Sequence, residues 1–166
     1  MEPTSLAGDG RGLAWCSSGP PAHADDWTPS NLLLDLIRQI ESADGLLLVG
    51  DDGRSPGAYQ ISRAAWADVN AWRKAHRLPV LEYSSNVWSE SISRSYAAQY
   101  LQLLHARLAR SLERSPSTAE LYAAYNLGLS GFARCRYHLG RVNANTAAKC
   151  RQIKAVVRGE RAFPGG

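Results

Sequence analysis

Cysteine is scarce in this chain, and its three copies are too few for a disulfide framework. Cys135 and Cys150 either pair in an oxidising compartment, which leaves Cys16 odd, or stay reduced and partly buried. The spacing Cys135-x-x-His138, with Cys150 further on, offers three metal ligands, whereas a structural zinc site needs four. We therefore expect no metal site and no cofactor.

Long apolar runs are also absent. No uninterrupted apolar stretch approaches the roughly 20 residues of a transmembrane helix, so we expect no membrane span. With 166 residues, 45% of them hydrophobic and 20% charged, the chain is typical of one globular domain. We expect a lead-in without regular structure over 1–27, a folded domain over 28–158 and a loose tail over 159–166, in a monomer.

Acidic residues become rare in the last third of the chain. From Arg107 onward there are 11 Lys and Arg residues, but only Glu113, Glu120 and Glu160 are acidic. Such a segment is either an ordinary solvated helix face or a surface for a polyanion such as a cell-wall polymer, nucleic acid or anionic lipid. Nucleic acid is disfavoured, because the segment lacks a recognised binding motif and interleaved aromatic residues.

A first helix is expected after the lead-in, with Thr28 as its cap and Pro29 at the first helical position. Its apolar residues recur at helical spacing and form one buried face: Leu33, Leu36, Ile37 and Ile40. Glu41 follows at the edge of that face. The sequence thus places one partly buried carboxylate at the end of an apolar helix, next to a glycine-rich loop.

The pattern changes over residues 46–61, where short apolar runs flank an Asp-Asp-Gly turn and predict a small β-hairpin. Gly57 would let the backbone approach a ligand closely, while Tyr59 would supply a flat face and Gln60 an amide. The rest of the chain is expected to be helical. The expected helices run from Ser62 past Trp72, over about 86–113, from the Ser117 capping box to Gly128, and over about 143–158.

Three of these motifs carry a family resemblance. Glu41-Ser42, then Gly57-Ala-Tyr-Gln-Ile61, then Ala124-Tyr-Asn-Leu-Gly128 resemble in order and spacing the Glu-Ser, Gly-Leu-Met-Gln and Ala-Tyr-Asn-x-Gly motifs of soluble lytic transglycosylases. The turn Asp51-x-Gly53 before the second motif looks like that of invertebrate-type lysozymes. The resemblance spans about 32–157 and implies a lysozyme-like α+β fold, mostly helical with a small hairpin.

The resemblance also implies an activity, cleavage of the β-1,4 bond between N-acetylmuramic acid and N-acetylglucosamine in peptidoglycan or a related amino-sugar glycan. Glu41 would be the general acid, since a partly buried glutamate can carry a proton near neutral pH. A hydrolase needs a second carboxylate, for which we favour Asp51 over Asp52, although Asp-Asp-Gly is also an ordinary turn. A lytic transglycosylase needs none, because the sugar's own hydroxyl closes a 1,6-anhydro ring.

The matched motifs imply further substrate-binding residues, which are Ser42, Gly57, Tyr59, Gln60, Tyr125 and Asn126. A noncatalytic glycan-binding module with the same fold is a further alternative. The implied activity places the protein outside the cytoplasm, either secreted or periplasmic. Ala22-His23-Ala24 has the small-x-small form of a signal-peptidase site, although no apolar core precedes it.

Overall fold

A computed structural model of the chain describes residues 27–43, 45, 47–50 and 55–159. This part of the chain is mostly helical, with one two-stranded β element, which confirms the expected class. Residues 1–26 of the expected lead-in over 1–27 and most of the expected tail lie outside the described residues, whereas Trp27 is described and its ring stacks on that of His105. The helices are α1 (Asn31–Ser42), α2 (Arg63–Ala75), α3 (Tyr83–Asn86), α4 (Glu90–Leu112), α5 (Thr118–Arg134) and α6 (Ala144–Val157), with a short 3-10 helix, η2 (Leu139–Arg141), before α6.

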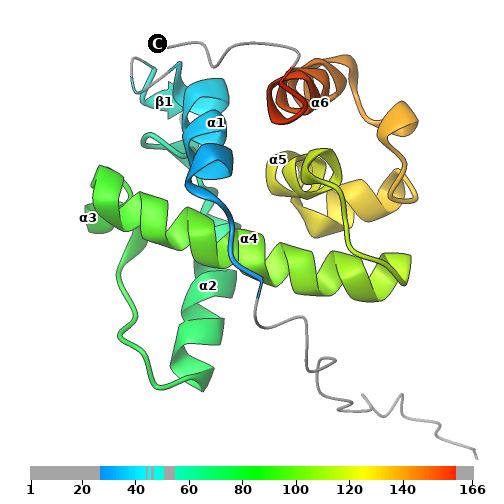
Figure 1. The fold of residues 1–166 in the computed structure, drawn as a ribbon. Helices are drawn as coiled ribbons and strands as arrows, with labels where there is room; N and C mark the ends of the chain where they lie inside the picture. The colour runs from blue at the N-terminus through cyan, green and yellow to red at the C-terminus, as the bar shows by residue number, and fades with distance from the viewer. Residues whose placement is uncertain (1–26, 44, 46, 51–54, 160–166) are drawn as a thin grey trace, which may run out of the picture.

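The long helix α4 runs through the middle of the molecule, and the other helices are arranged around it (Figure 1). Helices α1, α2 and α5 all contact α4, and α6 packs against α5. On one side of α4, the indole of Trp66 stacks on the ring of Tyr96 at a centroid distance of 3.6 Å. Further along α4, Leu101, Leu104 and Leu108 are fully buried. The central helix therefore separates α2, which extends from it on one side, from α1, α5 and α6, which lie on the other (Figure 1).

Capping residues set where the helices begin. Helix α1 starts at Asn31, because the Ser30 hydroxyl accepts a hydrogen bond from the Leu33 amide; the expected cap at Thr28 lies two residues too early. The predicted capping box of α5 is confirmed: Ser117 accepts from the Glu120 amide while the Glu120 carboxylate accepts from the Ser117 amide. Helix α2 begins after Ser62, as expected.

Gly128 interrupts α5 without ending it. Its φ of 70° and ψ of 157° are non-helical, yet helical structure resumes and continues to Arg134. The expectation that the helix stops at Gly128 was therefore half right: the geometry breaks there and the chain re-enters a helix. Residues on both sides of this kink line the pocket described below.

The predicted hairpin is present as two short strands, β1 (Val49–Gly50) and β2 (Ser55–Pro56). They pair antiparallel, with Val49 opposite Pro56 and Gly50 opposite Ser55. Gly57 follows with a φ of +90°, and a Cβ there would clash with the Val87 carbonyl oxygen. Glycine is thus required at this position by its contact with the segment before α4.

The two described cysteines are unpaired. Cys135 is half-buried, and Cys150 is buried with its thiol donating to the Ala119 carbonyl oxygen. Burial raises the pKa of the Cys150 thiol to about 11, which keeps it protonated. Within the described part of the chain, no helix combines the length and the apolar character of a membrane span.

Candidate functional site

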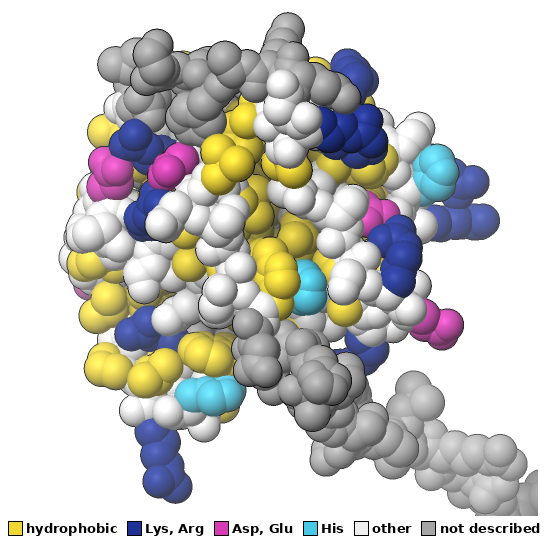
Figure 2. Space-filling model, viewed as in Figure 1, with side chains coloured by type: hydrophobic (Ala, Val, Ile, Leu, Met, Phe, Trp, Pro, Cys, Tyr) yellow, Lys and Arg dark blue, Asp and Glu magenta, His cyan; other side chains and the backbone are white. Residues whose placement is uncertain are grey.

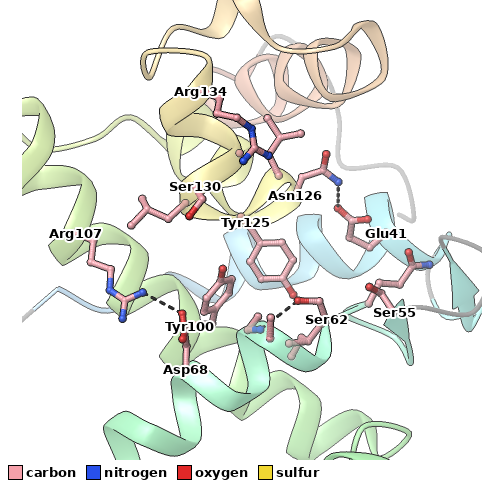
Figure 3. Close-up of a pocket in the computed structure, with 18 residues that line it drawn as sticks. Glu41, Ser55, Ser62, Asp68, Tyr100, Arg107, Tyr125, Asn126, Ser130 and Arg134 are labelled. Atoms are coloured by element: carbon pink, nitrogen blue, oxygen red, sulfur yellow. Dashed lines mark hydrogen bonds and ion pairs between the residues drawn. The ribbon is translucent and has the colours of Figure 1, made fainter.

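A pocket of about 460 Å³ lies between the end of α1 and the two halves of α5. Its lining comes from four helices, strand β2 and the loop before α2, so it gathers segments far apart in the chain (Figure 3). Polar and charged side chains predominate among the labelled residues. The polar and charged residues of the whole lining include Glu41 from α1, Gln60 and Ser62 from the loop, Asp68 from α2, Arg107 from α4, and Tyr125, Asn126, Ser130 and Arg134 from α5.

Glu41 is the most buried carboxylate of this lining, with 6% of its side chain exposed. One oxygen, Oε1, accepts from the Tyr122 hydroxyl at 2.5 Å and from the Asn126 amide at 3.4 Å. The other, Oε2, lies 3.1 Å from the Lys149 ammonium. Three donors from α5 and α6 therefore converge on one carboxylate from α1.

The donors around Glu41 are themselves held in place. The Thr146 hydroxyl donates to Asn126 Oδ1 at 2.7 Å, which leaves the amide nitrogen facing Glu41. Burial, together with the nearby Glu41 carboxylate, raises the pKa of Tyr122 well above its ordinary value. Its hydroxyl is therefore a proton donor to Glu41 across the physiological pH range.

Tyr125, Asn126 and Gln60, predicted as substrate-binding residues, all line the pocket with Glu41. Tyr125 forms part of the wall and donates its hydroxyl to the Tyr59 carbonyl oxygen at 2.7 Å. The Gln60 amide donates to the Leu47 carbonyl oxygen at 3.3 Å, which ties the loop to the segment before β1. The structure thus brings the first and third sequence motifs together at one cavity.

The other three predicted binding residues are buried and are not among the residues that line the pocket. Ser42 is fully buried, donates to the Arg38 carbonyl oxygen and accepts from the Gly45 amide, so it stabilises the end of α1. Tyr59 is fully buried, with its hydroxyl accepting from Arg94 at 2.7 Å. The backbone of Gly57 packs closely against the Val87 carbonyl group. All three support the site's framework instead of facing its cavity.

The predicted second carboxylate, Asp51, and its alternative Asp52 lie outside the described residues. A different carboxylate, Asp68, does line the pocket, together with Glu41. Asp68 forms an ion pair with Arg107 at 3.0 Å, and both side chains are more than two-fifths exposed. Figure 3 draws this pair on the far side of Tyr125 and Tyr100 from Glu41.

Sequence reasoning missed two direct partners of Glu41. Tyr122 could have been found, because it lies one helical turn before Asn126 and so shares its face. No local sequence pattern points to Lys149 as a partner of Glu41. The two residues are 108 positions apart in the chain, and the packing of α6 on α5 brings them together.

We also searched for metal-binding clusters and compared the chain with known proteins. In the ranges that the structure describes, no group of three or more His, Cys, Asp or Glu side chains is placed to hold a metal ion. We found no matching protein-family model, no matching curated protein and no matching solved structure. The site must therefore be interpreted from its own chemistry.

Proposed function

We propose that the chain is a lysozyme-like glycosidase that cleaves the β-1,4 bond between N-acetylmuramic acid and N-acetylglucosamine in peptidoglycan, with Glu41 as the general acid. One observation carries the proposal. Glu41, a nearly buried glutamate at the end of α1, lines the pocket, and its carboxylate contacts donor groups of Tyr122, Asn126 and Lys149. The resemblance of the three sequence motifs supports the same assignment.

The surroundings of Glu41 suit proton transfer to a glycosidic oxygen. A protonated Glu41 that gives up its proton becomes a carboxylate, and the three donors are already in position to stabilise that charge. Hydrogen-bond donors that await a developing charge lower the barrier, because they need no reorganisation during the step. The same carboxylate can then take a proton from the group that attacks the sugar.

Two mechanisms fit this acid, and one feature favours the lyase route. In a hydrolase, a second carboxylate either attacks the sugar from about 5 Å away or activates water from a longer distance. Among the described pocket residues, the second carboxylate is Asp68, which is already paired with Arg107. A lytic transglycosylase needs no second carboxylate, so it is our alternative, whereas a role for Asp51 would favour hydrolysis.

An acidic glycan also suits the charge of the molecule. Helices α5 and α6 and the turn between them carry a run of basic residues from Arg134 to Arg158. Figure 2 shows Lys and Arg side chains outnumbering acidic ones on the side of this face where α5 and α6 lie. Such a surface attracts a polyanion. We propose action on the cell wall by a secreted or periplasmic protein.

The decisive experiment compares the wild type with Glu41→Gln on purified peptidoglycan, following release of soluble fragments. We expect Glu41→Gln to lower the rate by about 1000-fold, because the amide cannot donate a catalytic proton. Glu90→Gln is the matched control, since Glu90 is 58% exposed and pairs with Arg38 outside the pocket. Circular dichroism checks that both variants keep the fold.

Mass analysis of the released fragments distinguishes the two mechanisms. Products with 1,6-anhydro ends indicate a transglycosylase, and reducing ends indicate a hydrolase. A wild type that releases no fragment across a broad pH range, or a Glu41→Gln variant with full activity, would contradict the proposal. Binding of peptidoglycan without any cleavage would instead indicate the glycan-binding module.

A further inference from the structure

One cation of the pocket is left without an acidic partner. Four charged residues line the cavity: Glu41, Asp68, Arg107 and Arg134. Glu41 pairs with Lys149 and Asp68 pairs with Arg107. Among the described residues, Arg134 has neither an ion pair nor a side-chain hydrogen bond. The two pairs are each neutral when their members are charged, so among the described residues of the pocket one positive charge, that of Arg134, is uncompensated.

The Arg134 guanidinium lies over the cavity lining. Gly131 is also a lining residue of the pocket, and a Cβ placed on it would lie 3.8 Å from Arg134 Nη2. The Arg134 side chain therefore folds back along α5 and lies next to Gly131, which has no side chain of its own. Figure 3 shows Arg134 extending from α5 on the same side of the pocket as Asn126. Arg134 is also solvent-exposed, and its charge is therefore available to a ligand at the pocket mouth.

A free guanidinium at a glycan pocket favours a particular ligand. Its planar donor fork matches a carboxylate, with which it forms two parallel hydrogen bonds. N-acetylmuramic acid differs from N-acetylglucosamine by a lactyl ether, which ends in a carboxylate or continues into a peptide that bears carboxylates. A polymer of N-acetylglucosamine alone has no such group. The pocket charge therefore discriminates between two glycans that share the same β-1,4 bond.

We propose that Arg134 is a specificity residue that binds a carboxylate of the glycan substrate and so selects acidic, muramic-acid-containing chains over neutral ones. The inference rests on the proposed function in placing a glycan in this pocket. It requires no cleavage, and it assigns Arg134 no part in proton transfer.

The test measures binding by calorimetry, so that it does not depend on turnover. Three soluble probes are compared: an N-acetylglucosamine–N-acetylmuramic acid tetrasaccharide with free lactyl carboxylates, the same tetrasaccharide with these groups converted to methylamides, and the neutral tetramer of N-acetylglucosamine. The glycosidic oxygen atoms of all three probes are replaced by sulfur, which resists cleavage, so that Glu41 stays in place and keeps Lys149 paired during the titration. We expect the acid form to bind about tenfold more tightly than its methylamide, as one charge-assisted pair allows.

Arg134→Gln should abolish the preference for the acid form and leave binding of the neutral tetramer unchanged. Arg134→Lys should keep part of the preference, because lysine retains the positive charge. Arg136→Gln is the matched control, because Arg136 is exposed two residues further on and is not among the pocket residues. Equal binding of acid and methylamide, no measurable binding of the acid form, or an undiminished preference in Arg134→Gln would overturn the inference. Cleavage assays on unmodified peptidoglycan judge the proposed function separately, because an active enzyme without the carboxylate preference fails only here.

Discussion

The pocket holds two carboxylate–cation pairs that share their chemistry and differ in their surroundings. Glu41 and Lys149 are 6% and 22% exposed, whereas Asp68 and Arg107 are 46% and 43% exposed. Their ion-pair distances are almost equal, 3.1 and 3.0 Å. Removal from water makes a charge expensive to leave unpaired, while exposure lets solvent screen it. Distance alone therefore says little about what each pair does, and burial separates a candidate catalytic group from a surface contact.

The largest effect is expected from Lys149→Met, which leaves the buried Glu41 without its cation. The methionine keeps the apolar length of the side chain, so the change removes mainly the charge. We expect the free energy of unfolding at pH 7 to fall by about 3 kcal/mol, the usual cost of breaking a buried pair from one side. Urea denaturation followed by circular dichroism measures this change.

Lys154→Met is the control for that variant, because Lys154 is exposed on the same helix and, in the described part of the chain, forms no ion pair with a carboxylate of the pocket. It should change the stability by no more than about 0.5 kcal/mol. If Lys149→Met and Lys154→Met were equally stable, the Glu41–Lys149 contact would not be a buried pair in solution. The double variant Glu41→Gln with Lys149→Met should recover part of the loss, since it removes both charges.

The α1 side of the pocket and the side formed by α5 and α6 also differ in how well the sequence predicts them. On the α1 side, apolar spacing and a terminal acid predict both the helix and the position of Glu41, because these depend on neighbours a few residues away. The Ser117 capping box and the hairpin are local in the same sense, and they too are predicted. The start of α1 was missed by two residues, because Ser30 competes with Thr28 as the cap.

Contacts made by distant segments could not be foreseen in this way. The approach of Lys149 to Glu41 depends on how α6 packs on α5, and no local pattern encodes that. The sequence motif also does not show whether Tyr59 faces the cavity or the core. In the structure Tyr59 is fully buried, and its hydroxyl accepts a hydrogen bond from Arg94 of α4. Sequence patterns thus located the acid, while packing decided which of its neighbours face the cavity.

The Glu120–Arg114 pair lies between the two pairs of the pocket in its exposure to solvent. Glu120 is 10% exposed and pairs with Arg114, which is 54% exposed, outside the pocket. Hydrogen bonds from Arg114, and then from the Ser117 amide and hydroxyl, lower the pKa of Glu120 to about 2. We expect Glu120→Gln to reduce the free energy of unfolding at pH 7 by about 2 kcal/mol, through loss of the charge-assisted bonds and part of the capping box.

This contribution should depend on pH in a defined direction. The carboxyl group has a lowered pKa in the folded state and one near 4.3 when unfolded, so ionised Glu120 stabilises the fold above about pH 4. The stabilisation should fade as the pH falls toward 2, where wild type and Glu120→Gln should converge. The exposed neighbour Glu113 provides the control Glu113→Gln. A gap between wild type and Glu120→Gln that stays constant from pH 7 to 2 would show that the charge is not its origin.

The smallest effect is expected at the exposed pair of the pocket. Asp68→Asn should lower the free energy of unfolding by about 0.5 kcal/mol or less, because both side chains are largely solvated and salt screens their attraction. A double-mutant cycle with Arg107→Gln at 0.02 and 0.5 M salt measures the coupling energy and its screening. Coupling that exceeds about 2 kcal/mol and persists at high salt would mean that solvent does not reach the pair, and the contrast with Glu41 and Lys149 would then fail. A small, salt-sensitive coupling would agree with the exposure of both side chains.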